Sequence, residues 1–342
     1  QFICGPEVDE IEEVLKNFIN SKYCISTSSG TDALLIALMA LDINSGDEII
    51  TTPFSFISTT EVISLLGAIP VFVDIDPQTY NIDPKLVVKA ITSKTKAIIA
   101  VSLYGQPADF KVLNAIASKN NIPIIEDGAQ SFGSKHYKRF SCNLSTIGTT
   151  SFFPSKPFGA YGDGGACFTN DEGLADRMRR ISKHGQTKRY FHTEIGINGR
   201  LDTIQAAILL AKFPMFEEEL KLRQKKADFY TLNLNHNGIK TTPIIQKNNT
   251  SVFAQYTIQV KDRTNVQKYL KDNNVPSSVH YPLPINNQPA FKNKYKFNEY
   301  HNQVSISKSA SEKVLSIPMH PWLKQNEQEK VISCLKEAVN KT

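Results

Sequence analysis

Short apolar runs and amphipathic segments alternate along the first half of the chain. The runs Ala97–Val101 and Pro123–Ile125 are apolar without interruption, which is typical of strands that are buried on both faces of a sheet. The strand-helix alternation from Ser29 to about Phe168 predicts an α/β fold with a mostly parallel sheet and helices on both faces. We expect strands at Glu48–Thr51, Pro70–Val73, Ala97–Val101, Pro123–Glu126 and Thr150–Phe153, and helices at Thr31–Leu41, Ser58–Leu66, Pro84–Ile91 and Phe110–Lys119.

The second half of the chain has a different pattern. Leu201–Leu234 is rich in Ala, Leu, Glu and Lys and predicts a long helix, broken or kinked at Pro214, that connects two domains. We therefore expect a large domain over 1–235 and a smaller α+β domain over 236–342. In the smaller domain the pattern predicts a half-exposed strand at Ser251–Val260, helices at Asn265–Asn273 and Glu327–Val339, and a polar loop at Asn286–Gln303.

Composition narrows the class of protein. The chain has 342 residues, of which 41% are hydrophobic, enough for a large core. Its net charge of +6 suits an anionic substrate or a solvated lysine-rich face, and no basic tract with interleaved aromatics points to nucleic acid. The five dispersed cysteines lack metal-ligand spacing, so we expect free thiols in the cytoplasm and no metal site. No apolar stretch reaches membrane-spanning length, so we expect no membrane partner.

Asp127 and Lys156 have the most informative surroundings. Asp127 follows the strand that ends at Glu126, and Lys156 follows the strand-like Thr150–Phe153. Ligands of open α/β sheets bind at the carboxyl ends of the strands. A lysine there can form a Schiff base with pyridoxal phosphate, and an aspartate can keep the ring nitrogen of that cofactor protonated. A helix N-cap for Asp127 and a solvated position for Lys156 are the ordinary alternatives, but together the two residues predict an active site.

Other candidates are less specific when taken alone. Gly30 and Thr31 follow two serines at the start of a helix, where a phosphate can bind but where an ordinary N-cap is common. Phe56 follows a strand and can stack on a planar ring or pack in the core. The glycines of Gly162–Gly165 lack the GxGxxG arrangement, so we expect no dinucleotide site. Substrate contacts can come from loops that contain His184, Asn198, Arg200, His280 and Tyr281.

Six motifs follow one another along the chain: Gly30–Leu34, Gly46–Ile50, Phe72–Asp76, Ile125–Gln130, Ser151–Lys156 and Gly162–Gly165. In this order they resemble the DegT/DnrJ/EryC1/StrS family of pyridoxal-phosphate-dependent nucleotide-sugar aminotransferases, over essentially the whole chain. The resemblance implies fold type I, the aspartate aminotransferase-like fold. Because such proteins carry a helical segment before the position of Gly5–Pro6, we also expect residues before Gln1 to be missing.

The resemblance implies a role for each candidate residue and a homodimer that shares its active sites. On this basis Lys156 would hold pyridoxal phosphate as a Schiff base, Asp127 would pair with the ring nitrogen, Gln130 would lie near the ring hydroxyl, Phe56 would stack on the ring, and Gly30, Thr31 and Ser151 would bind the phosphate. The neighbouring subunit would supply Asn198 to the phosphate and His280 and Tyr281 to the sugar pocket, while Arg200 would bind a sugar carboxylate and His184 would be a further substrate contact.

The substrate follows from the same resemblance. Ser102–Gln106, Ser141–Thr146 and His280–Pro284 look most like the branch that aminates UDP-2-acetamido-2-deoxy-3-oxo-D-glucuronate. The implied donor is L-glutamate, the second cofactor form is pyridoxamine phosphate, and the product would serve surface polysaccharide biosynthesis of the O-antigen type. Two alternatives stay open. One is an aminotransferase for a 3- or 4-keto dTDP- or UDP-hexose, and the other is a catalytically silent regulatory protein that binds pyridoxal phosphate.

Overall fold

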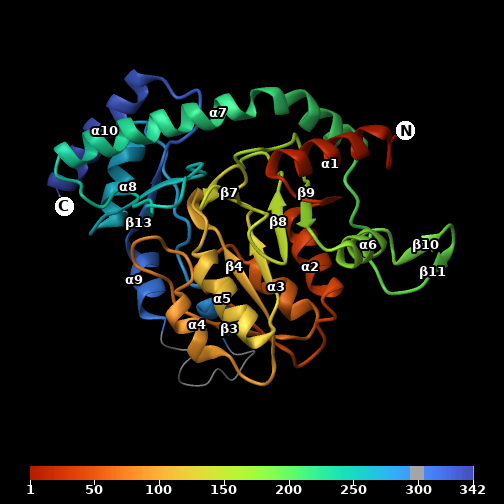
Figure 1. The fold of residues 1–342 in the computed structure, drawn as a ribbon. Coiled ribbons are helices and arrows are strands. Elements are labelled where there is room, and N and C mark those ends of the chain that lie inside the picture. The colour runs from red at the N-terminus through yellow and green to blue at the C-terminus, as the bar shows by residue number, and fades with distance from the viewer. Residues whose placement is uncertain (293–303, 342) are drawn as a thin grey trace.

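The structure, a computed structural model, describes residues 1–292 and 304–341. In this part of the chain the central sheet has seven strands in the order β1-β9-β8-β5-β4-β2-β3 (Figure 1). All neighbouring pairs are parallel except the two that involve β9, which runs against β1 and β8. The strands are β1 (Tyr23–Thr27), β2 (Glu48–Thr51), β3 (Ile69–Phe72), β4 (Thr95–Val101), β5 (Ile124–Asp127), β8 (Ile147–Ser151) and β9 (Gly165–Thr169).

Helices cover both faces of this sheet because successive strand residues point to opposite sides. Ile99 packs with α2, α3 and α6, whereas its neighbour Ile98 packs with α4 and α5. Next to α4 and α5, the second face is covered by α1 and the first part of α7. The helices are α1 (Pro6–Ile19), α2 (Gly30–Ala40), α3 (Ser58–Leu65), α4 (Pro84–Ala90), α5 (Phe110–Asn120), α6 (Glu172–Ile181) and α7 (Thr203–His236).

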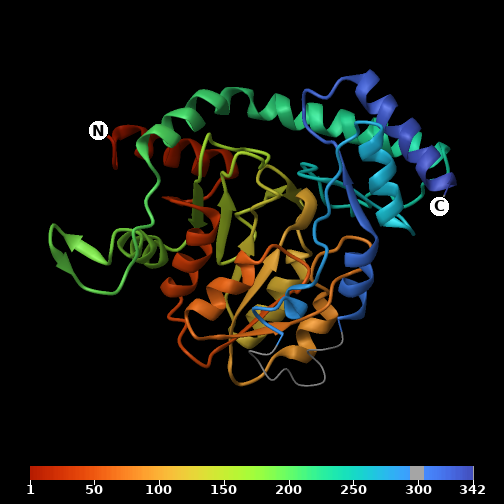
Figure 2. The same ribbon diagram turned by 180° about the vertical axis from the view of Figure 1, so that it is seen from behind.

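Helix α7 joins two hydrophobic clusters. Leu209 and Phe216 in its first part pack with α1, and Tyr230 and Leu234 near its end pack in a cluster formed by the C-terminal elements. A break or a kink was expected at Pro214, and the helix continues through this residue without a break. Seen from behind, α8 and α10 lie beside the last turns of α7 (Figure 2). The C-terminal elements are β12 (Tyr256–Gln259), α8 (Arg263–Asp272), η2 (Ile285–Asn287), α9 (Ser305–Lys313), β13 (Val314–Ile317) and α10 (Gln325–Asn340).

Some elements differ in length from those that the sequence pattern predicted. The strand expected at Thr150–Phe153 is β8, which ends at Ser151, and the strand expected at Ser251–Val260 shrinks to β12. Of the expected loop 286–303, residues 293–303 lie outside the described residues. The domain boundary between 235 and 236 stays a prediction. The pattern did not indicate η1 (Leu103–Gly105) or the two-residue strands β6 (Lys135–His136) and β7 (Arg139–Phe140).

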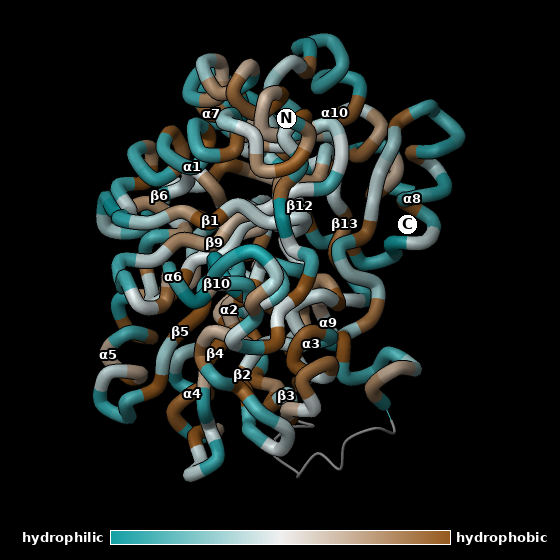
Figure 3. The backbone as a smooth tube through the Cα atoms, turned by 90° about the vertical axis from the view of Figure 1, so that its right-hand side faces the viewer, coloured by the Kyte–Doolittle hydropathy of each residue, from teal (hydrophilic) through white to brown (hydrophobic). Residues whose placement is uncertain are grey.

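A hairpin projects from the body of the molecule next to α6 (Figure 1). It consists of β10 (Gln186–Lys188) and β11 (Phe191–His192), which pair antiparallel. Coloured by hydropathy, β10 is hydrophilic while the middle strands of the sheet are largely hydrophobic (Figure 3). In residues 1–292 and 304–341, no helix combines the length and apolar content that crossing a bilayer requires.

Candidate functional site

Asp127 is the last residue of β5 and marks the carboxyl edge of the sheet. The parallel strands β4 and β8 flank β5, so the segments that follow all three strands begin at this edge. Asp127 is only 5% exposed. Its Oδ2 accepts the hydroxyl proton of Thr59 over 2.7 Å, and its Oδ1 accepts the N–H of Ala129 over 3.2 Å. A buried carboxylate therefore lies where the sequence predicted one, held by two donors.

Lys156 lies in the turn after β8, where its N–H donates to the Phe153 carbonyl over 2.8 Å. The rings of Phe152 and Phe158 anchor this turn in the cluster below α1 and α7. The side chain of Lys156 is half-buried. Burial lowers the pKa of its amine, and the nearby Asp127 carboxylate opposes that shift. A lowered pKa leaves the amine neutral more of the time, and the neutral amine is the nucleophile.

Gln130 connects two loops at the same edge. Its Oε1 accepts the N–H of Tyr104 over 2.8 Å, and its Nε2 donates to the hydroxyl of Tyr281 over 3.1 Å. The Tyr104 hydroxyl donates to the carbonyl of His280, whose Nδ1 lies 2.9 Å from the Ser316 Oγ. These bonds tie the loop of His280 and Tyr281 to the sheet edge.

His280 and Tyr281 lie in the site of the chain that carries them. Burial and the charge of Lys156 lower the pKa of His280. Burial and the Asp127 carboxylate raise the pKa of Tyr281. At neutral pH the site thus presents a neutral imidazole and a protonated phenol. The expectation that the neighbouring subunit supplies these two residues is wrong, because the chain itself returns to Gln130 at this point.

Phe56 adds an aromatic ring to the polar cluster that Asp127, Lys156, Gln130 and Tyr281 form at the sheet edge. It is 54% exposed, and its ring centroid lies 6.2 Å from that of Tyr281, with 42° between the ring planes. It follows β2, the strand next to β4 in the sheet. An exposed ring beside a polar cluster is available to stack on a planar ligand.

The start of α2 lies against the end of β8 and fits a phosphate group. A Cβ on Gly30 would come within 2.6 Å of the Ser151 Cβ, so the close approach needs glycine. Ser29 accepts the N–H of Asp32 over 3.0 Å, while the N–H groups of Gly30 and Thr31 have no protein acceptor among the described residues. Two free N–H groups at a helix start, next to a serine hydroxyl, are suited to bind phosphate oxygens.

The structure does not bring the other three candidates to Lys156. His184 is exposed at the base of the β10–β11 hairpin, where its N–H donates to the Ile197 carbonyl. Asn198 is exposed and bridges to Lys183 through the backbone. Arg200 lines a small cavity below α1, and its Nε has no partner among the described residues. In one chain, therefore, these side chains lie outside the polar cluster.

Sequence reasoning missed two buried residues of the site, Thr59 and Glu126. Both are 0% exposed. Glu126 gave a signal, because a charged residue inside a strand that is buried on both faces must find buried partners. Thr59 gave none beyond its position three residues after Phe56.

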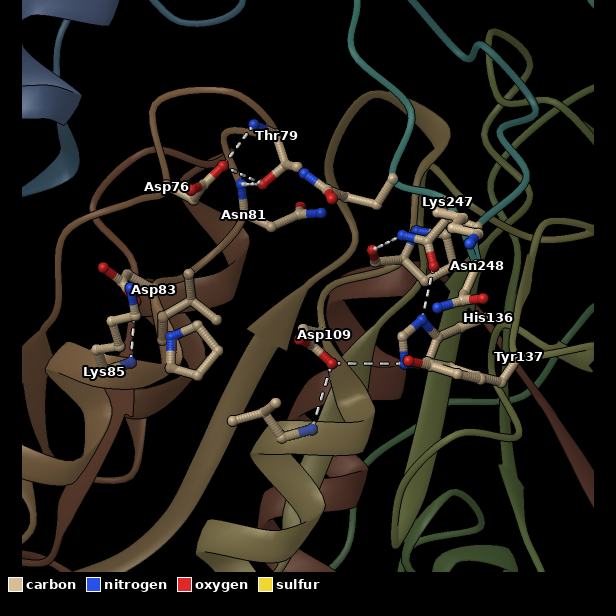
Figure 4. A pocket seen from close by; sticks show the side chains of 16 residues that line it. Asp76, Thr79, Asn81, Asp83, Lys85, Asp109, His136, Tyr137, Lys247 and Asn248 are labelled. Atoms are coloured by element: carbon tan, nitrogen blue, oxygen red, sulfur yellow. Dashed lines mark hydrogen bonds and ion pairs between the residues drawn. The ribbon is translucent and has the colours of Figure 1, made fainter.

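A separate cavity of about 400 Å³ lies beside α4 and α5 (Figure 4). Its carboxylates are used within the protein: Asp83 and Asp109 cap the two helices, and Asp76 accepts three bonds from its own loop. His136 is bonded at both ring nitrogens, to Asn249 and to a backbone N–H. In the described part of the chain no group of three or more His, Cys, Asp or Glu residues is placed to hold a metal ion.

A lysine of lowered pKa, a buried aspartate, an exposed aromatic ring and a helix start with free N–H groups fit pyridoxal phosphate. On a mostly parallel sheet with helices on both faces, they define a pyridoxal-phosphate-dependent enzyme of fold type I. The chain belongs to the DegT/DnrJ/EryC1/StrS aminotransferase family, whose sequence profile matches residues 1–336.

Two relatives and a solved structure show the extent of the similarity. The chain is 55% identical over 323 residues to the UDP-2-acetamido-2-deoxy-3-oxo-D-glucuronate aminotransferase of Pseudomonas aeruginosa, covering 94% of this chain and 88% of the relative. It is 42% identical over 340 residues to a pleiotropic regulatory protein of Geobacillus stearothermophilus, covering 98% and 90%. The crystal structure of DesV from S. venezuelae in complex with a ketimine intermediate superposes with a TM-score of 0.95 at 31% identity, covering 100% of this chain and 91% of that one.

These similarities confirm the family, the fold class and the cofactor that the motifs predicted. The protein is an aminotransferase that uses pyridoxal phosphate and its pyridoxamine form. The roles of the individual site residues stay predictions, and the geometry given above supports them to different degrees.

Proposed function

We propose that the protein transfers an amino group from L-glutamate to C3 of UDP-2-acetamido-2-deoxy-3-oxo-D-glucuronate. The observation that carries the proposal is the cluster of Lys156, Asp127 and Gln130 at the sheet edge, in a chain 55% identical to an enzyme named for this substrate. The 3-amino sugar would enter surface polysaccharide of the O-antigen type. The five free cysteines fit a reducing compartment, and we propose the cytoplasm as the location.

Each side chain of the cluster has a defined task in this proposal. Pyridoxal phosphate, when bound, supplies an aldehyde that takes up the amino group and a ring that withdraws electrons. Lys156 would hold the aldehyde, and its released Nζ would carry a proton from the carbon that bears the amino group to the carbon of that aldehyde. Asp127 keeps the ring nitrogen protonated, Phe56 covers one ring face, and the start of α2 with Ser151 binds the phosphate.

His280 and Tyr281 serve the substrate side of the site. The lowered pKa of His280 keeps its imidazole neutral at pH 7, so the ring meets a sugar hydroxyl as a neutral hydrogen-bonding partner. The raised pKa of Tyr281 keeps its hydroxyl protonated, and Gln130 donates to its oxygen, so the tyrosine proton is free for the substrate.

We further propose that a second copy of the chain completes the site. Arg200 and Asn198 lie outside the cluster of their own chain, whereas a guanidinium matches the carboxylate of a glucuronate. Large apolar side chains near Lys156 are exposed in one chain: Phe153 is 50% and Tyr161 is 75% exposed. Such residues are typical of surfaces that a partner covers. In the dimer, Arg200 would reach the sugar carboxylate, Asn198 the phosphate, and His184 the substrate.

Mixing two inactive variants tests the shared site. Lys156→Ala and Arg200→Ala each damage every site of a homodimer. If Arg200 acts in the partner's site, a mixed dimer has one site with both residues intact, and co-refolding equal amounts restores about a quarter of wild-type activity. No recovery in a mixture that forms mixed dimers would show that Arg200 acts in its own subunit, and an Arg200→Ala variant as active as wild type would show that it has no role in the site.

The substrate is tested with a panel of UDP- and dTDP-linked keto-sugars and glutamate, read by mass spectrometry. We expect a 3-amino product from the UDP-3-oxo-glucuronate only. Amination of a neutral keto-hexose instead would favour the alternative substrate class. Glutamate alone should convert the lysine-bound cofactor to its pyridoxamine form. A protein whose absorbance does not change with glutamate would instead be a regulatory binder, the kind of activity for which the Geobacillus relative is named.

A further inference from the structure

Two buried hydroxyl groups are linked to the Asp127 carboxylate by successive hydrogen bonds. The Thr59 Oγ1 is 2.7 Å from Asp127 Oδ2, and the Ser55 Oγ is 3.0 Å from the Thr59 Oγ1. Thr59 is 0% exposed and Ser55 is 4% exposed, so water does not compete for these bonds. The three groups form a continuous chain from the segment after β2 to the end of β5.

The direction of this chain follows from the chemistry of its last member. An ionised carboxylate has no proton to give, so Thr59 donates to Asp127. The single hydroxyl proton of Thr59 is then used, and its oxygen can only accept. Ser55 must therefore be the donor of the bond between the two hydroxyls. The bond from Ser55 polarises the Thr59 hydroxyl and so strengthens the bond that Thr59 donates to the Asp127 carboxylate.

The two carboxylate oxygens of Asp127 have different hydrogen-bond donors. Oδ2 is held by the short, charge-assisted bond from Thr59, whereas among the described residues Oδ1 accepts only the longer 3.2 Å bond from the Ala129 N–H. Because a carboxylate oxygen accepts two bonds, Oδ1 keeps capacity for a further donor. We propose that Thr59, oriented by Ser55, is a positioning residue that fixes the Asp127 carboxylate for the protonated ring nitrogen of the cofactor. This inference rests on the function proposed above.

The position of Thr59 in the fold strengthens the inference. Thr59 belongs to the first turn of α3, and its N–H bonds to the carbonyl of Phe56 over 3.3 Å. One short segment therefore carries the ring that covers the cofactor and the hydroxyl that orients its carboxylate partner. A shift of this turn would move the Phe56 ring and the Thr59 hydroxyl together, so the two groups would keep their positions relative to each other.

The chain offers a matched control at the next residue. Thr60 is also a threonine of α3 and is also 0% exposed, but its Oγ1 has no hydrogen-bond partner among the described residues. Thr59→Val and Thr60→Val each replace a buried hydroxyl by a methyl group of similar shape. Of the two variants, Thr59→Val removes the bond to Asp127, whereas Thr60→Val leaves it in place. Thr59→Ser keeps the hydroxyl and provides the conservative rescue.

The experiment compares these variants as holoenzymes. We expect Thr59→Val to lower kcat about 10- to 100-fold, the effect of losing a hydrogen bond to a buried charge, with KM for both substrates unchanged. Thr59→Ser should stay within about 3-fold of wild type, Ser55→Ala should lose about 3-fold because Thr59 keeps its bond, and Thr60→Val should be as active as wild type. Circular dichroism and thermal melting confirm that each variant folds.

A second measurement does not depend on turnover. Pyridoxal phosphate labelled with ¹⁵N in the ring reports the protonation of the ring nitrogen through its chemical shift. We expect the shift to move toward the unprotonated value in Thr59→Val and to stay in place in Thr60→Val. Equal behaviour of the two valine variants in both measurements would overturn the inference. A wild-type protein that neither binds the cofactor nor turns over would instead refute the proposed function.

Discussion

Glu126 offers the sharpest test of the electrostatics around the site. It precedes Asp127 on β5 and is 0% exposed. Its Oε1 accepts the hydroxyls of Ser102 and Ser141 over 2.9 and 2.6 Å, and its Oε2 accepts the N–H of Cys142 over 2.8 Å. These bonds hold together loops that follow β4 and precede β8. The substitution Glu126→Gln keeps the shape of this side chain and removes its charge.

The magnitude follows from the pKa of the carboxyl. Burial raises the pKa of Glu126 from 4.5 to about 7, although its three donors oppose the shift. Between these two pH values the folded protein binds a proton that the unfolded chain does not, so stability falls as the pH rises through this window and is level above it. Because a tenfold change in proton affinity is worth about 1.4 kcal/mol, the ionised carboxylate costs about 3 kcal/mol above pH 7.

The glutamine variant avoids this cost. Its amide oxygen can accept the Cys142 N–H, and its NH₂ group can face the two serine hydroxyls, which rotate to accept. We expect Glu126→Gln to equal the wild type in stability near pH 4.5 and to exceed it by about 3 kcal/mol at pH 8. Urea unfolding of both proteins from pH 4.5 to 8.5, with excess pyridoxal phosphate, measures the difference while other titrating groups cancel.

Two results would contradict a raised pKa of Glu126. A stability difference that does not change with pH would mean that Glu126 does not titrate in the window. A wild type that is more stable than the variant at pH 8 would mean that the three donors stabilise the carboxylate by more than burial disfavours it. In either case the pKa of Glu126 would not be raised.

Two further predictions concern the cofactor. Lys156→Ala should lose both the visible absorbance of lysine-bound pyridoxal phosphate and turnover, and an unchanged spectrum would contradict the assignment of this lysine. Gly30→Ala should weaken binding of pyridoxal phosphate about 10-fold in an absorbance titration, because the new Cβ meets the Ser151 Cβ at 2.6 Å. Gly173→Ala is the control, since within the described part of the chain its Cβ would meet only the Asp171 side chain at 3.3 Å, and equal affinities in the two variants would refute the phosphate site.

The sequence predicted the elements whose signals are local. The strand Glu48–Thr51 coincides with β2, and the helix expected at Pro84–Ile91 is α4 within one residue. There, a proline follows the capping Asp83, whose side chain accepts the N–H of Lys85. Lys156 and Asp127 were also proposed from local signals, because each lies where a strand ends or has just ended and has a side chain suited to one cofactor.

Features that depend on distant partners could not be predicted in this way. The segment Ile147–Ser151 contains one large apolar residue, yet four of its five residues are buried because β5 and β9 flank it. The expected strand was therefore placed too far along, on Phe152 and Phe153. The bond between Gln130 and Tyr281 joins residues 151 apart in the chain, and only the fold shows that it forms within one subunit.

The order of the strands explains why the contact between the start of α2 and the end of β8 needs glycines in two places. Strand β9 lies between β1 and β8, and because it is antiparallel its first residue, Gly165, pairs with Thr27 and with Ser151 at the carboxyl edge. The chain leaving β1 must cross this position before α2 can begin beside β8. A Cβ on Gly165 would come within 2.6 Å of the Ser29 carbonyl, so a side chain there would push the helix start away from Ser151. Gly165, the last glycine of the motif at 162–165, thus lets the N–H groups of Gly30 and its neighbour reach the edge that also carries Lys156.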